Sequence, residues 1–351
     1  MIKQKILHIL YSGLGGTTDY VFNLIKADVG HEFEHHILFY GVEKVPLPQL
    51  NLANTIADSV TYIPKQKGYD KQAFKAVLLY LKNEKPSVIV LHVNSLILTC
   101  AKYKASKLIF VEHQANHLKT KKEWLWSLIA QKKSDRIISF TTLYQKELSQ
   151  ALKLFYNKDK STIINTGIDL SVYKPINKPV NTIIKIGIIS RINSFRDHET
   201  LLKAFLELNS TAELFIAGNG PLKQTLELKY KSKNITWLGL LDAKQIKELL
   251  KSLDIYVIAS FGESTSIALM QAQASGLPII ATNVNGINNV LTSTNCVFVT
   301  LNSVSEYKNA LQLLINDTAK RQTLAKNSLA YATVNLSHFS MFERYKKLFK
   351  L

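Results

Sequence analysis

Short apolar runs alternate with longer amphipathic segments along nearly the whole of this 351-residue chain. The alternation stops at residues 174–182, which read KPINKPVNT and contain two prolines but no apolar periodicity. Short buried strands joined by amphipathic helices are the pattern of parallel sheets covered by helices on both faces. A proline-containing segment without periodicity is typical of a linker. We therefore predict an α/β protein with two domains of similar size.

The linker places an N-terminal domain at residues 1–175 and a C-terminal domain at residues 176–335, and a last helix at 336–351 is expected to return to the first domain. Open α/β sheets bind ligands beyond the carboxyl ends of their parallel strands. We therefore expect two Rossmann-like domains that face each other across a cleft, with the ligand in that cleft.

Each domain has its own series of predicted strands. Those of the N-terminal domain are Lys5–Leu10, His35–Tyr40, Ser59–Ile63, Val88–Val93, Lys107–Glu112, Arg136–Phe140 and Ser161–Ile164. Those of the C-terminal domain are Ile183–Ile189, Ala212–Ala217, Ile235–Leu238, Ile255–Ala259, Pro278–Thr282 and Val297–Val299. The loops after these strands are where functional side chains are expected.

The formal net charge is +18, from 44 basic and 26 acidic side chains. The excess is spread along the chain, because residues 1–174 carry 24 basic and 14 acidic side chains and the remainder carries 20 and 12. Such a charge favours the binding of polyanions such as nucleic acid, anionic lipid surfaces or phosphorylated substrates. The alternative is a solvated, lysine-rich surface without a specific partner. Since no module interleaves basic with aromatic residues, we do not expect nucleic-acid binding.

The sequence also predicts the compartment. No run of about 18 uncharged apolar residues occurs, so no membrane-spanning helix is expected. The run Ile6–Tyr11 is interpreted as a buried first strand rather than a secretory signal, because no small-residue cleavage site follows it. Cys100 and Cys296 are far apart and fit neither a disulfide framework nor a zinc site. These features predict a cytoplasmic protein.

Two arginines follow the first predicted strand of the C-terminal domain, in ISRINSFRDHETLLKAF. Arg191 and Arg196 lie on a loop that leads into a helix. Two cations beside a helix N-terminus can hold a diphosphate through charge-assisted hydrogen bonds and the helix dipole. The alternative is that both arginines simply point into water.

Two further strand ends carry glycines. In IAGNGPLKQTLE, Gly218 and Gly220 either let the backbone approach a ligand or make a tight turn. In ITWLGLLDAKQI, Leu238 and Gly239 end another strand at the same edge of the sheet. We expect both turns to lie near the two arginines.

The most specific segment is SLDIYVIASFGESTSIALMQAQASG. A strand ends near Ser260, and a helix begins near Thr265 or Ser266. Glu263 is then expected beside the free N–H groups of the helix start, where it can accept hydrogen bonds from sugar hydroxyls. Gln271 follows about two helical turns later and so lies on the same side. The alternative is that Glu263 caps the helix.

The order and spacing of these segments resemble the GT-B glycosyltransferases of family 4, retaining enzymes that act on UDP-, GDP- and ADP-sugars. In that family an arginine and a lysine after the first C-domain strand hold the donor diphosphate. Arg191 matches the arginine, and Arg196 stands where the lysine is usual. Further family segments match the turn at residues 217–221 and the pair Leu238-Gly239. The resemblance covers nearly the whole chain.

The family's paired glutamates fall on Glu263 and Gln271. The first usually contacts the donor sugar, and the second usually binds the ribose hydroxyls. The resemblance therefore implies weakened ribose binding by the neutral amide of Gln271. It also assigns Ser264, Thr265 and Ser266 to the donor site, although the proline that usually follows the first glutamate is missing there.

The N-terminal domain carries two matching segments. Gly15 and Gly16 end the segment YSGLGG, which resembles the glycine loop that approaches the donor phosphates and the acceptor; loop flexibility alone is the alternative. In FVEHQANH, His113 follows a strand end where the family often has a histidine near the donor sugar. The alternatives are a structural role for His113 and its replacement by His92 or His117.

The segment Leu118–Lys133, LKTKKEWLWSLIAQKK, combines five lysines with Trp124 and Trp126. Lysines beside tryptophans suit an interfacial helix on an anionic membrane surface. In the alternative interpretation the tryptophans face the core of the N-terminal domain and the lysines are solvated.

These features and the resemblance together predict a hexosyltransferase-like enzyme, and the resemblance implies that it retains the anomeric configuration. It would move a sugar from a UDP- or GDP-sugar to a hydroxyl of a glycan or lipid-linked saccharide, in the synthesis of bacterial capsule, lipopolysaccharide or exopolysaccharide. Arg191 and Arg196 would stabilise the departing diphosphate, while Glu263 and His113 orient the sugar. The resemblance implies no metal and no cofactor beyond the nucleotide-sugar co-substrate, and a peripheral contact with the inner membrane face is a further expectation.

Two rival functions remain at this point. The first is a non-catalytic GT-B subunit that binds an acceptor or a partner transferase, and the substitution at Gln271 supports it. The second is a GT-B enzyme of other chemistry, such as a nucleotide-sugar epimerase, which no motif supports.

Overall fold

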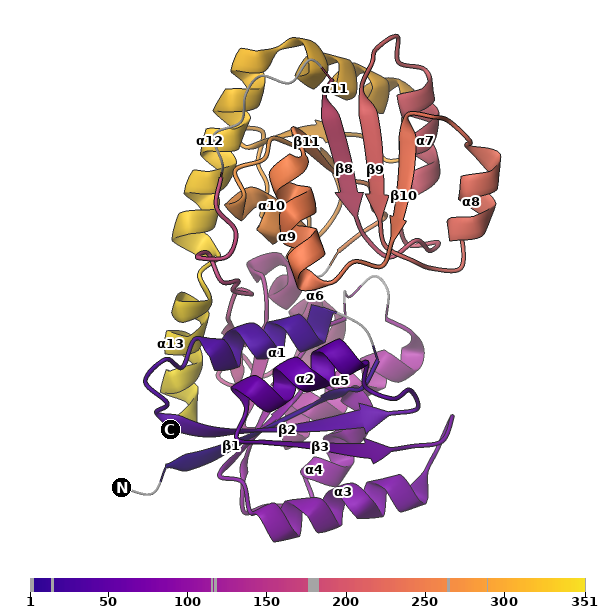
Figure 1. Cartoon of the computed structure of the whole chain (residues 1–351). Helices are drawn as coiled ribbons and strands as arrows, with labels where there is room; N and C mark the ends of the chain where they lie inside the picture. Colours follow the sequence, from indigo (N-terminus) through magenta and orange to yellow (C-terminus); the bar gives the residue numbers. More distant parts are fainter. Residues whose placement is uncertain are drawn as a thin grey trace. The chain divides into compact units, whose positions relative to one another are not determined.

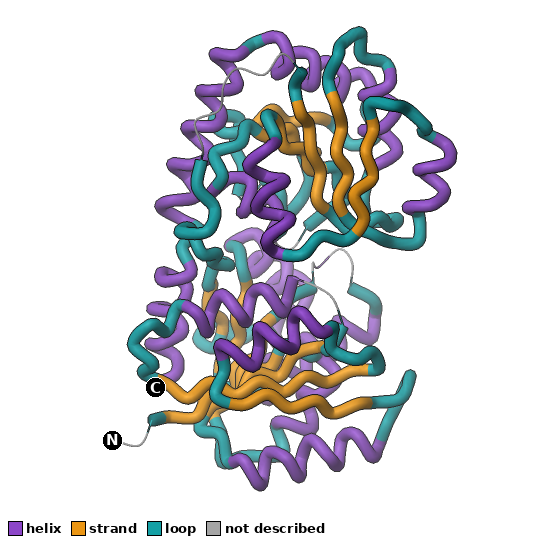
Figure 2. Tube along the Cα trace, viewed as in Figure 1, coloured by secondary structure: helices purple, strands orange, loops and turns teal. Residues whose placement is uncertain are grey.

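The computed structural model describes residues 3–13, 16–114, 116, 119–175, 183–263, 266–288 and 290–350. The chain forms two compact units: unit 1 comprises Met1–Gly167 and His338–Leu351, and unit 2 comprises Ile168–Ser337. Each unit holds one parallel sheet between layers of helices, as Figure 2 shows in orange and purple. The predicted α/β class is therefore confirmed.

The sheet of unit 1 has the strand order β3-β2-β1-β4-β5-β6-β7. Its strands are β1 (Gln4–Tyr11), β2 (Phe33–Gly41), β3 (Ser59–Pro64), β4 (Val88–Leu91), β5 (Lys107–Val111), β6 (Arg136–Ser139) and β7 (Ser161–Ile163). Every neighbouring pair runs parallel. The order reverses between β1 and β4, and such a reversal opens a crevice at the carboxyl edge of a parallel sheet.

Helices cover both faces of this sheet. They are α1 (Gly16–Lys26), α2 (Leu47–Ile56), α3 (Lys71–Glu84), η1 (Asn94–Leu96), α4 (Ile97–Cys100), α5 (Lys121–Lys133), α6 (Thr142–Leu152), η3 (Lys153–Phe155) and α13 (His338–Phe349). Alternate residues of each strand point to opposite faces. Ile6 and Leu10 therefore join the core under α1 and α13, whereas Leu7 and Ile9 join the core under α3, α4 and α5.

The helix α13 completes the first of these two cores. The hydroxyl groups of Tyr20 and Tyr345 lie 2.7 Å apart, and the ring of Phe33 makes edge contacts with the rings of Phe342 and Phe349. Figure 1 shows α13, in yellow, beside α1. The last described residues of the chain are thus built into unit 1.

The sheet of unit 2 has the strand order β10-β9-β8-β11-β12-β13 and is also parallel throughout. Its strands are β8 (Lys185–Ile189), β9 (Glu213–Ala217), β10 (Ile235–Gly239), β11 (Ile255–Ile258), β12 (Ile279–Thr282) and β13 (Cys296–Val299). Its helices are α7 (His198–Leu206), α8 (Lys223–Lys229), α9 (Ala243–Ser252), α10 (Ile267–Ala274), α11 (Val304–Asn316) and α12 (Thr318–Asn335). The reversal of strand order falls between β8 and β11.

Two apolar layers flank the sheet of unit 2. Ile255 and Val257 of β11 pack with α7, α8 and α11, and Tyr256 and Ile258 pack with α9 and α10. The strand β11 is therefore buried on both sides, which explains why its sequence is an unbroken apolar run.

The boundary between the units differs from the prediction. It lies at Gly167 and Ile168 rather than after residue 175, because residues 168–175 pack with unit 2. The N–H group of Ile168 donates to the carbonyl of Leu336, and the side chain of Ile168 is buried in a cluster with Leu336 and Met270. The predicted linker falls mostly on residues 176–182, which lie outside the described residues.

Within the described part of the chain, no helix combines the length and apolar character needed to cross a membrane.

Candidate functional site

Two predicted site residues meet in unit 2. Arg196, in the loop between β8 and α7, forms an ion pair with Glu263, in the loop between β11 and α10, with Nη2 and Oε1 2.8 Å apart. The pair lies at the carboxyl edge where the strand order reverses, which is the usual ligand position in such sheets. The Arg196 side chain is 20% exposed and the Glu263 side chain 8%, so the guanidinium is the part of the pair that solvent reaches more easily.

The hydroxyl of Ser260 holds the arginine against this edge. Nη1 of Arg196 donates to Oγ of Ser260 over 2.7 Å, and that hydroxyl donates to the carbonyl of Gly262 over 2.9 Å. The backbone N–H of Phe261 donates to the carbonyl of Phe195, which joins the two loops directly. Sequence reasoning did not identify Ser260; a polar residue directly after a buried strand is the signal that could have found it.

Burial governs the charge of Glu263. It raises the pKa of this carboxyl to about 7, although the adjacent Arg196 guanidinium acts in the opposite direction. The carboxyl therefore changes between its neutral and ionised forms near physiological pH. It can accept a hydrogen bond in either form and donate one when protonated.

A glycine that sequence reasoning missed shapes the backbone of Glu263. The N–H of Glu263 donates to the carbonyl of Asn285 over 3.1 Å. Gly286 has φ +90°, and a Cβ atom there would lie 1.7 Å from the carbonyl oxygen of Glu263. Only glycine fits this position, and the Asn-Gly dipeptide is the sequence signal for such a turn.

Gly218 and Gly220 allow close packing of two neighbouring loops. A Cβ atom at Gly218 would lie 1.9 Å from the carbonyl oxygen of Ser190, and one at Gly220 would lie 2.1 Å from that of Ile192. The N–H of Ile192 donates to the carbonyl of Asn219. Both glycines therefore make tight turns that support the loop carrying Arg196. The predicted approach of this backbone to a ligand stays a prediction.

The remaining predicted residues near this edge have varied positions. Arg191 is exposed in the loop after β8. Leu238, near the end of β10, packs its side chain against the apolar cluster of α9 and α10. Ser266 is the N-cap of α10 and accepts a hydrogen bond from the N–H of Leu269. The predictions at Ser264 and Thr265 lie outside the described residues.

Gln271 lies in α10 and bonds to a residue that the sequence did not suggest. Its Nε2 donates to the hydroxyl of Tyr173 over 2.8 Å. Tyr173 follows Ile168 and therefore belongs to unit 2, whereas the predicted boundary had placed it in the N-terminal domain. The bond thus joins two residues of the same unit. The predicted role of Gln271 toward ribose stays a prediction.

In unit 1, the glycine segment is described only in part. Gly16 is the first residue of α1 and is exposed, whereas Gly15 lies outside the described residues. Gly13 is buried, and a Cβ atom there would lie 2.4 Å from the ring of Tyr11. Close packing is therefore one reason for a glycine in this segment.

His113 lies just after β5 at the carboxyl edge and is half-buried. Its Nε2 lies 2.7 Å from Nδ1 of His92, and its ring contacts the rings of Tyr20 and Phe140. Burial lowers the pKa of His113 to about 3, so the ring is neutral at physiological pH. His92 is thus the direct partner of His113, and the choice between them as the ligand-contacting histidine stays a prediction. His117 lies outside the described residues.

A buried ion pair holds the loop that carries His113. Nζ of Lys119 lies 2.9 Å from Oε2 of Glu112, and their side chains are 0% and 1% exposed. The hydroxyl of Tyr144 donates to the same carboxylate over 3.0 Å, and Nζ of Lys119 donates to Oγ of Ser127 over 2.8 Å. Sequence reasoning treated Lys119 as one of five surface lysines, which is wrong because Glu112 and Tyr144 enclose it.

Both tryptophans of the predicted interfacial segment are partly buried. Trp126 packs against the core under α3, α4 and α5, and Trp124 packs against the cluster that contains Tyr144. The structure therefore favours the core-facing interpretation for the tryptophans. Lys132 and Lys133, at the end of α5, are exposed.

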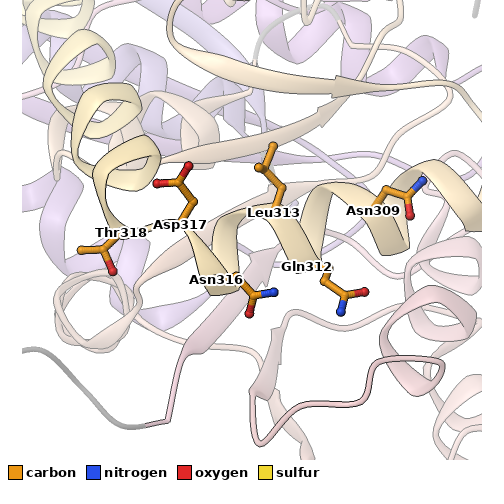
Figure 3. A pocket seen from close by; sticks show the side chains of 6 residues that line it. All are labelled: Asn309, Gln312, Leu313, Asn316, Asp317 and Thr318. Atoms are coloured by element: carbon orange, nitrogen blue, oxygen red, sulfur yellow. The ribbon is translucent and has the colours of Figure 1, made fainter.

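A hollow in unit 2 is separate from this site. Figure 3 shows its lining, which consists of Asn309, Gln312, Leu313, Asn316, Asp317 and Thr318. In a parallel α/β sheet the helices run back toward the amino edge of the strands, so the end of α11 lies at the edge opposite to Arg196 and Glu263. Among the described residues, no group of three or more His, Cys, Asp or Glu side chains could hold a metal ion.

Two family models match adjoining parts of the chain. The one described as "Glycosyltransferase Family 4" matches residues 14–172, and the one described as "Glycosyl transferases group 1" matches residues 173–330. The two Rossmann-like units and these matches define the class of GT-B proteins. The chain belongs to the GT-B glycosyltransferases of family 4.

Curated relatives match over part of their length. The chain is 28% identical over 140 residues to the putative glycosyltransferase EpsF of Bacillus subtilis (strain 168), which covers 35% of this chain and 36% of that protein. It is 26% identical over 242 residues to the UDP-Gal:alpha-D-GlcNAc-diphosphoundecaprenol alpha-1,3-galactosyltransferase of Escherichia coli, which covers 62% of this chain and 60% of that protein. The chain thus spans less than two thirds of each of these relatives.

A solved structure matches over the full length. The crystal structure of Anabaena Alr3699/HepE in complex with UDP and glucose has a TM-score of 0.85 and 16% sequence identity, and the match covers 99% of each chain. This similarity shows the GT-B fold.

Proposed function

We propose that this protein is a glycosyltransferase that moves a sugar from a nucleotide-sugar donor to a hydroxyl of a glycan or lipid-linked saccharide. The observation that carries the proposal is the Arg196–Glu263 pair at the carboxyl edge of unit 2, where the strand order reverses. A guanidinium stabilises the negative charge that develops on a departing diphosphate. A carboxyl group beside it can bond to the hydroxyls of the transferred sugar.

In this proposal Arg196 and the exposed Arg191 hold the diphosphate, and the first N–H groups of α10 add partial positive charge nearby. Glu263 and His113 orient the sugar. Transfer proceeds with retention of configuration, the leaving phosphate takes part in deprotonating the acceptor, and neither a metal nor another cofactor is needed. These last points extend the family resemblance to this chain.

The relatives support a choice of donor and acceptor. The Anabaena structure holds UDP and glucose, and the name of the Escherichia coli relative specifies UDP-Gal and a diphosphoundecaprenol-linked acceptor. A UDP-hexose donor is therefore our first choice, with a GDP-sugar as the second. We also propose a lipid-linked acceptor, and with it a role in bacterial surface polysaccharide synthesis.

We further propose a cytoplasmic protein that contacts the inner membrane face through the end of α5 and the turn η3. Leu154 is 98% exposed and Phe155 53%, and Nζ of Lys132 lies 4.7 Å from the centroid of the Phe155 ring. Exposed apolar side chains beside lysines suit an anionic bilayer. Co-sedimentation with anionic vesicles should decrease in a Lys132→Glu/Phe155→Ser variant but not in Lys75→Glu, which makes a similar charge change at an exposed position of α3.

A calorimetric titration tests the enzymatic function. UDP, GDP and ADP are titrated into the whole chain, followed by their sugars, and slow donor hydrolysis is assayed for any sugar that binds. Binding of one nucleotide with hydrolysis of its sugar supports the proposal. Folded protein that binds none of these nucleotides would instead identify the non-catalytic GT-B subunit, which the engagement of Gln271 with Tyr173 favours.

A further inference from the structure

Ser190 is the residue that follows β8, and it is half-buried at the carboxyl edge of unit 2. The strand order reverses beside β8, so Ser190 lies where ligands usually bind in such a sheet. Its backbone is fixed on both sides, because its N–H donates to the carbonyl of Ala217 over 3.0 Å and its own carbonyl lies against Gly218. The position of the Ser190 hydroxyl is therefore set by a single side-chain torsion.

A buried histidine bonds to this hydroxyl. Oγ of Ser190 lies 2.9 Å from Nε2 of His198, the first residue of α7, which is 1% exposed. The other ring nitrogen of His198, Nδ1, is buried and has no hydrogen-bond partner in the described part of the chain. Within that same part, the Ser190 hydroxyl makes no hydrogen bond other than the one to His198.

The unpaired Nδ1 determines the direction of this hydrogen bond. A neutral imidazole carries its proton on one of its two nitrogens. A proton on Nδ1 of His198 would be a buried N–H without an acceptor, which is rarer in proteins than an unpaired acceptor. With the proton on Nε2, His198 donates to Oγ of Ser190. A charged ring would also donate from Nε2, so Ser190 accepts in both of these forms.

The proton of the Ser190 hydroxyl is then left for a ligand. A serine hydroxyl has one proton to donate, and Oγ of Ser190 already accepts from His198. Because no acceptor for that proton lies among the residues that the structure describes, a ligand atom that accepts would complete the site. Phosphate oxygens accept strongly, and hydrogen bonds to them are charge-assisted.

The cations near Ser190 favour an anionic acceptor over a neutral one. Arg191 is the next residue in the chain and is exposed. Burial lowers the pKa of His198 to about 4, and the nearby Arg196 guanidinium acts in the same direction, which shows that its charge reaches this ring. Two positive charges beside one free hydroxyl proton attract a negatively charged group.

The acidic neighbours do not cancel this attraction. Asp197 is 4% exposed, and its carboxylate accepts from the backbone N–H groups of Thr200 and Asn302. Glu263 is paired with Arg196. Both carboxyl groups are thus occupied by donors of the protein.

We propose that Ser190 is a phosphate-binding residue, whose hydroxyl donates to an oxygen of the donor diphosphate. This inference rests on the proposed function, because that function supplies the diphosphate. His198 is a positioning residue, since its Nε2–H holds Oγ of Ser190 and leaves the hydroxyl proton to the ligand. Ser190 therefore adds a hydrogen bond of defined direction to the charges of Arg191 and Arg196.

The direction of the bond can be measured without a ligand. Side-chain ¹⁵N NMR of the whole chain, with the signal of His198 assigned by the substitution His198→Gln, is expected to show the Nε2–H tautomer at neutral pH. An Nδ1–H tautomer would mean that Ser190 donates to the ring, and this result overturns the proposal.

Calorimetric titration of inorganic pyrophosphate and of UDP tests the ligand. Ser190→Ala should weaken the binding of both about tenfold, because it removes a hydrogen bond to a charged group. Ser190→Thr keeps the hydroxyl and should bind both as the unsubstituted chain does. Ser252→Ala, which removes a hydroxyl at the end of α9, should change neither affinity. Circular dichroism checks that each variant folds.

Uridine, which has no phosphate, distinguishes binding from a merely structural role. Its affinity should be the same for Ser190→Ala and the unsubstituted chain, and equal weakening of uridine and UDP would overturn the proposal. His198→Gln keeps an N–H donor and should preserve most of the pyrophosphate affinity. His198→Leu leaves Oγ of Ser190 without its donor and should weaken pyrophosphate binding at unchanged uridine affinity.

The outcomes separate this inference from the proposed function. If pyrophosphate binding depends on Ser190 but no nucleotide binds, the role of Ser190 stands and the proposed function fails. If UDP binds equally well to the unsubstituted chain and to Ser190→Ala, the proposed function stands and the role of Ser190 fails. Folded protein that binds neither pyrophosphate nor UDP contradicts both.

Discussion

Nη2 of Arg196 lies 2.8 Å from Oε1 of Glu263, so the cation proposed for the diphosphate is paired with the carboxyl proposed for the sugar. Its Nη1 is engaged by Ser260 at the same time. Two loops that follow neighbouring strands thus depend on each other for their orientation. A substitution at either residue should therefore weaken the binding of both the diphosphate and the sugar.

Replacing Arg196 tests the diphosphate site. Arg196→Ala should weaken UDP binding about 10- to 100-fold, because a charge-assisted hydrogen bond contributes about 1.5–3 kcal/mol. The fold should survive, since the buried Glu263 can take up a proton when its partner is absent. Calorimetry measures the affinity, and Arg196→Lys, which restores the cation, is the matched control. Normal UDP binding by Arg196→Ala would remove Arg196 from the site.

Glu263 should make the stability of unit 2 depend on pH. The folded chain keeps this proton to about pH 7, whereas an unperturbed glutamate releases it near pH 4.5, so the free energy of unfolding falls as the pH rises between these values. The loss attributable to Glu263 is at most about 3 kcal/mol. Glu263→Gln should lack this part of the pH dependence. Denaturant unfolding of both proteins between pH 4 and about 8 measures it, and parallel curves would contradict it.

Gly286 should be intolerant of any side chain. Gly286→Ala combines a positive φ with a Cβ atom 1.7 Å from the carbonyl oxygen of Glu263, and we expect a loss of about 2–4 kcal/mol. Gly239→Ala is the matched control in the same unit, because Gly239 has φ +71° but no atom within 4 Å of the added Cβ. Its loss should be about 1 kcal/mol. Equal thermal midpoints for the two variants would show that Gly286 does not constrain Glu263.

The buried pair of Lys119 and Glu112 should be costly to break. Lys119→Met leaves a buried carboxylate without its cation, and such losses are about 3–5 kcal/mol. Adding Glu112→Gln to Lys119→Met should recover part of that stability, because a neutral amide can still accept from the Tyr144 hydroxyl. Chemical denaturation gives the coupling between the two sites. Additive effects would mean that the two side chains do not interact.

The periodicity of the sequence predicted most of the sheet. The predicted strand Ser59–Ile63 ends one residue before β3 does, and β9 begins at Glu213, one residue after its predicted start. These predictions succeed because each depends only on which residues are buried along one segment.

Contacts between distant loops were not predictable in the same way. Arg196 meets Glu263 because β8 and β11 are neighbours, and strand order is not contained in the periodicity of either segment. Ser260 was missed for the same reason. Lys119 was misjudged because its burial is decided by Glu112, on the other side of a loop. The boundary after Gly167 reflects the hydrogen bond from the N–H of Ile168 to the carbonyl of Leu336. These two residues lie near the two ends of unit 2 in sequence, so no local pattern relates them.

The helix α13 has a consequence for the order in which the chain can fold during synthesis. Unit 2 is continuous in sequence, whereas unit 1 lacks α13 until residues 338–350 have been translated. Until then, the face of the sheet that carries Ile6 and Leu10 is without Phe342, Tyr345 and Phe349. On the ribosome, unit 2 can therefore reach its native state first, and unit 1 waits for its last helix.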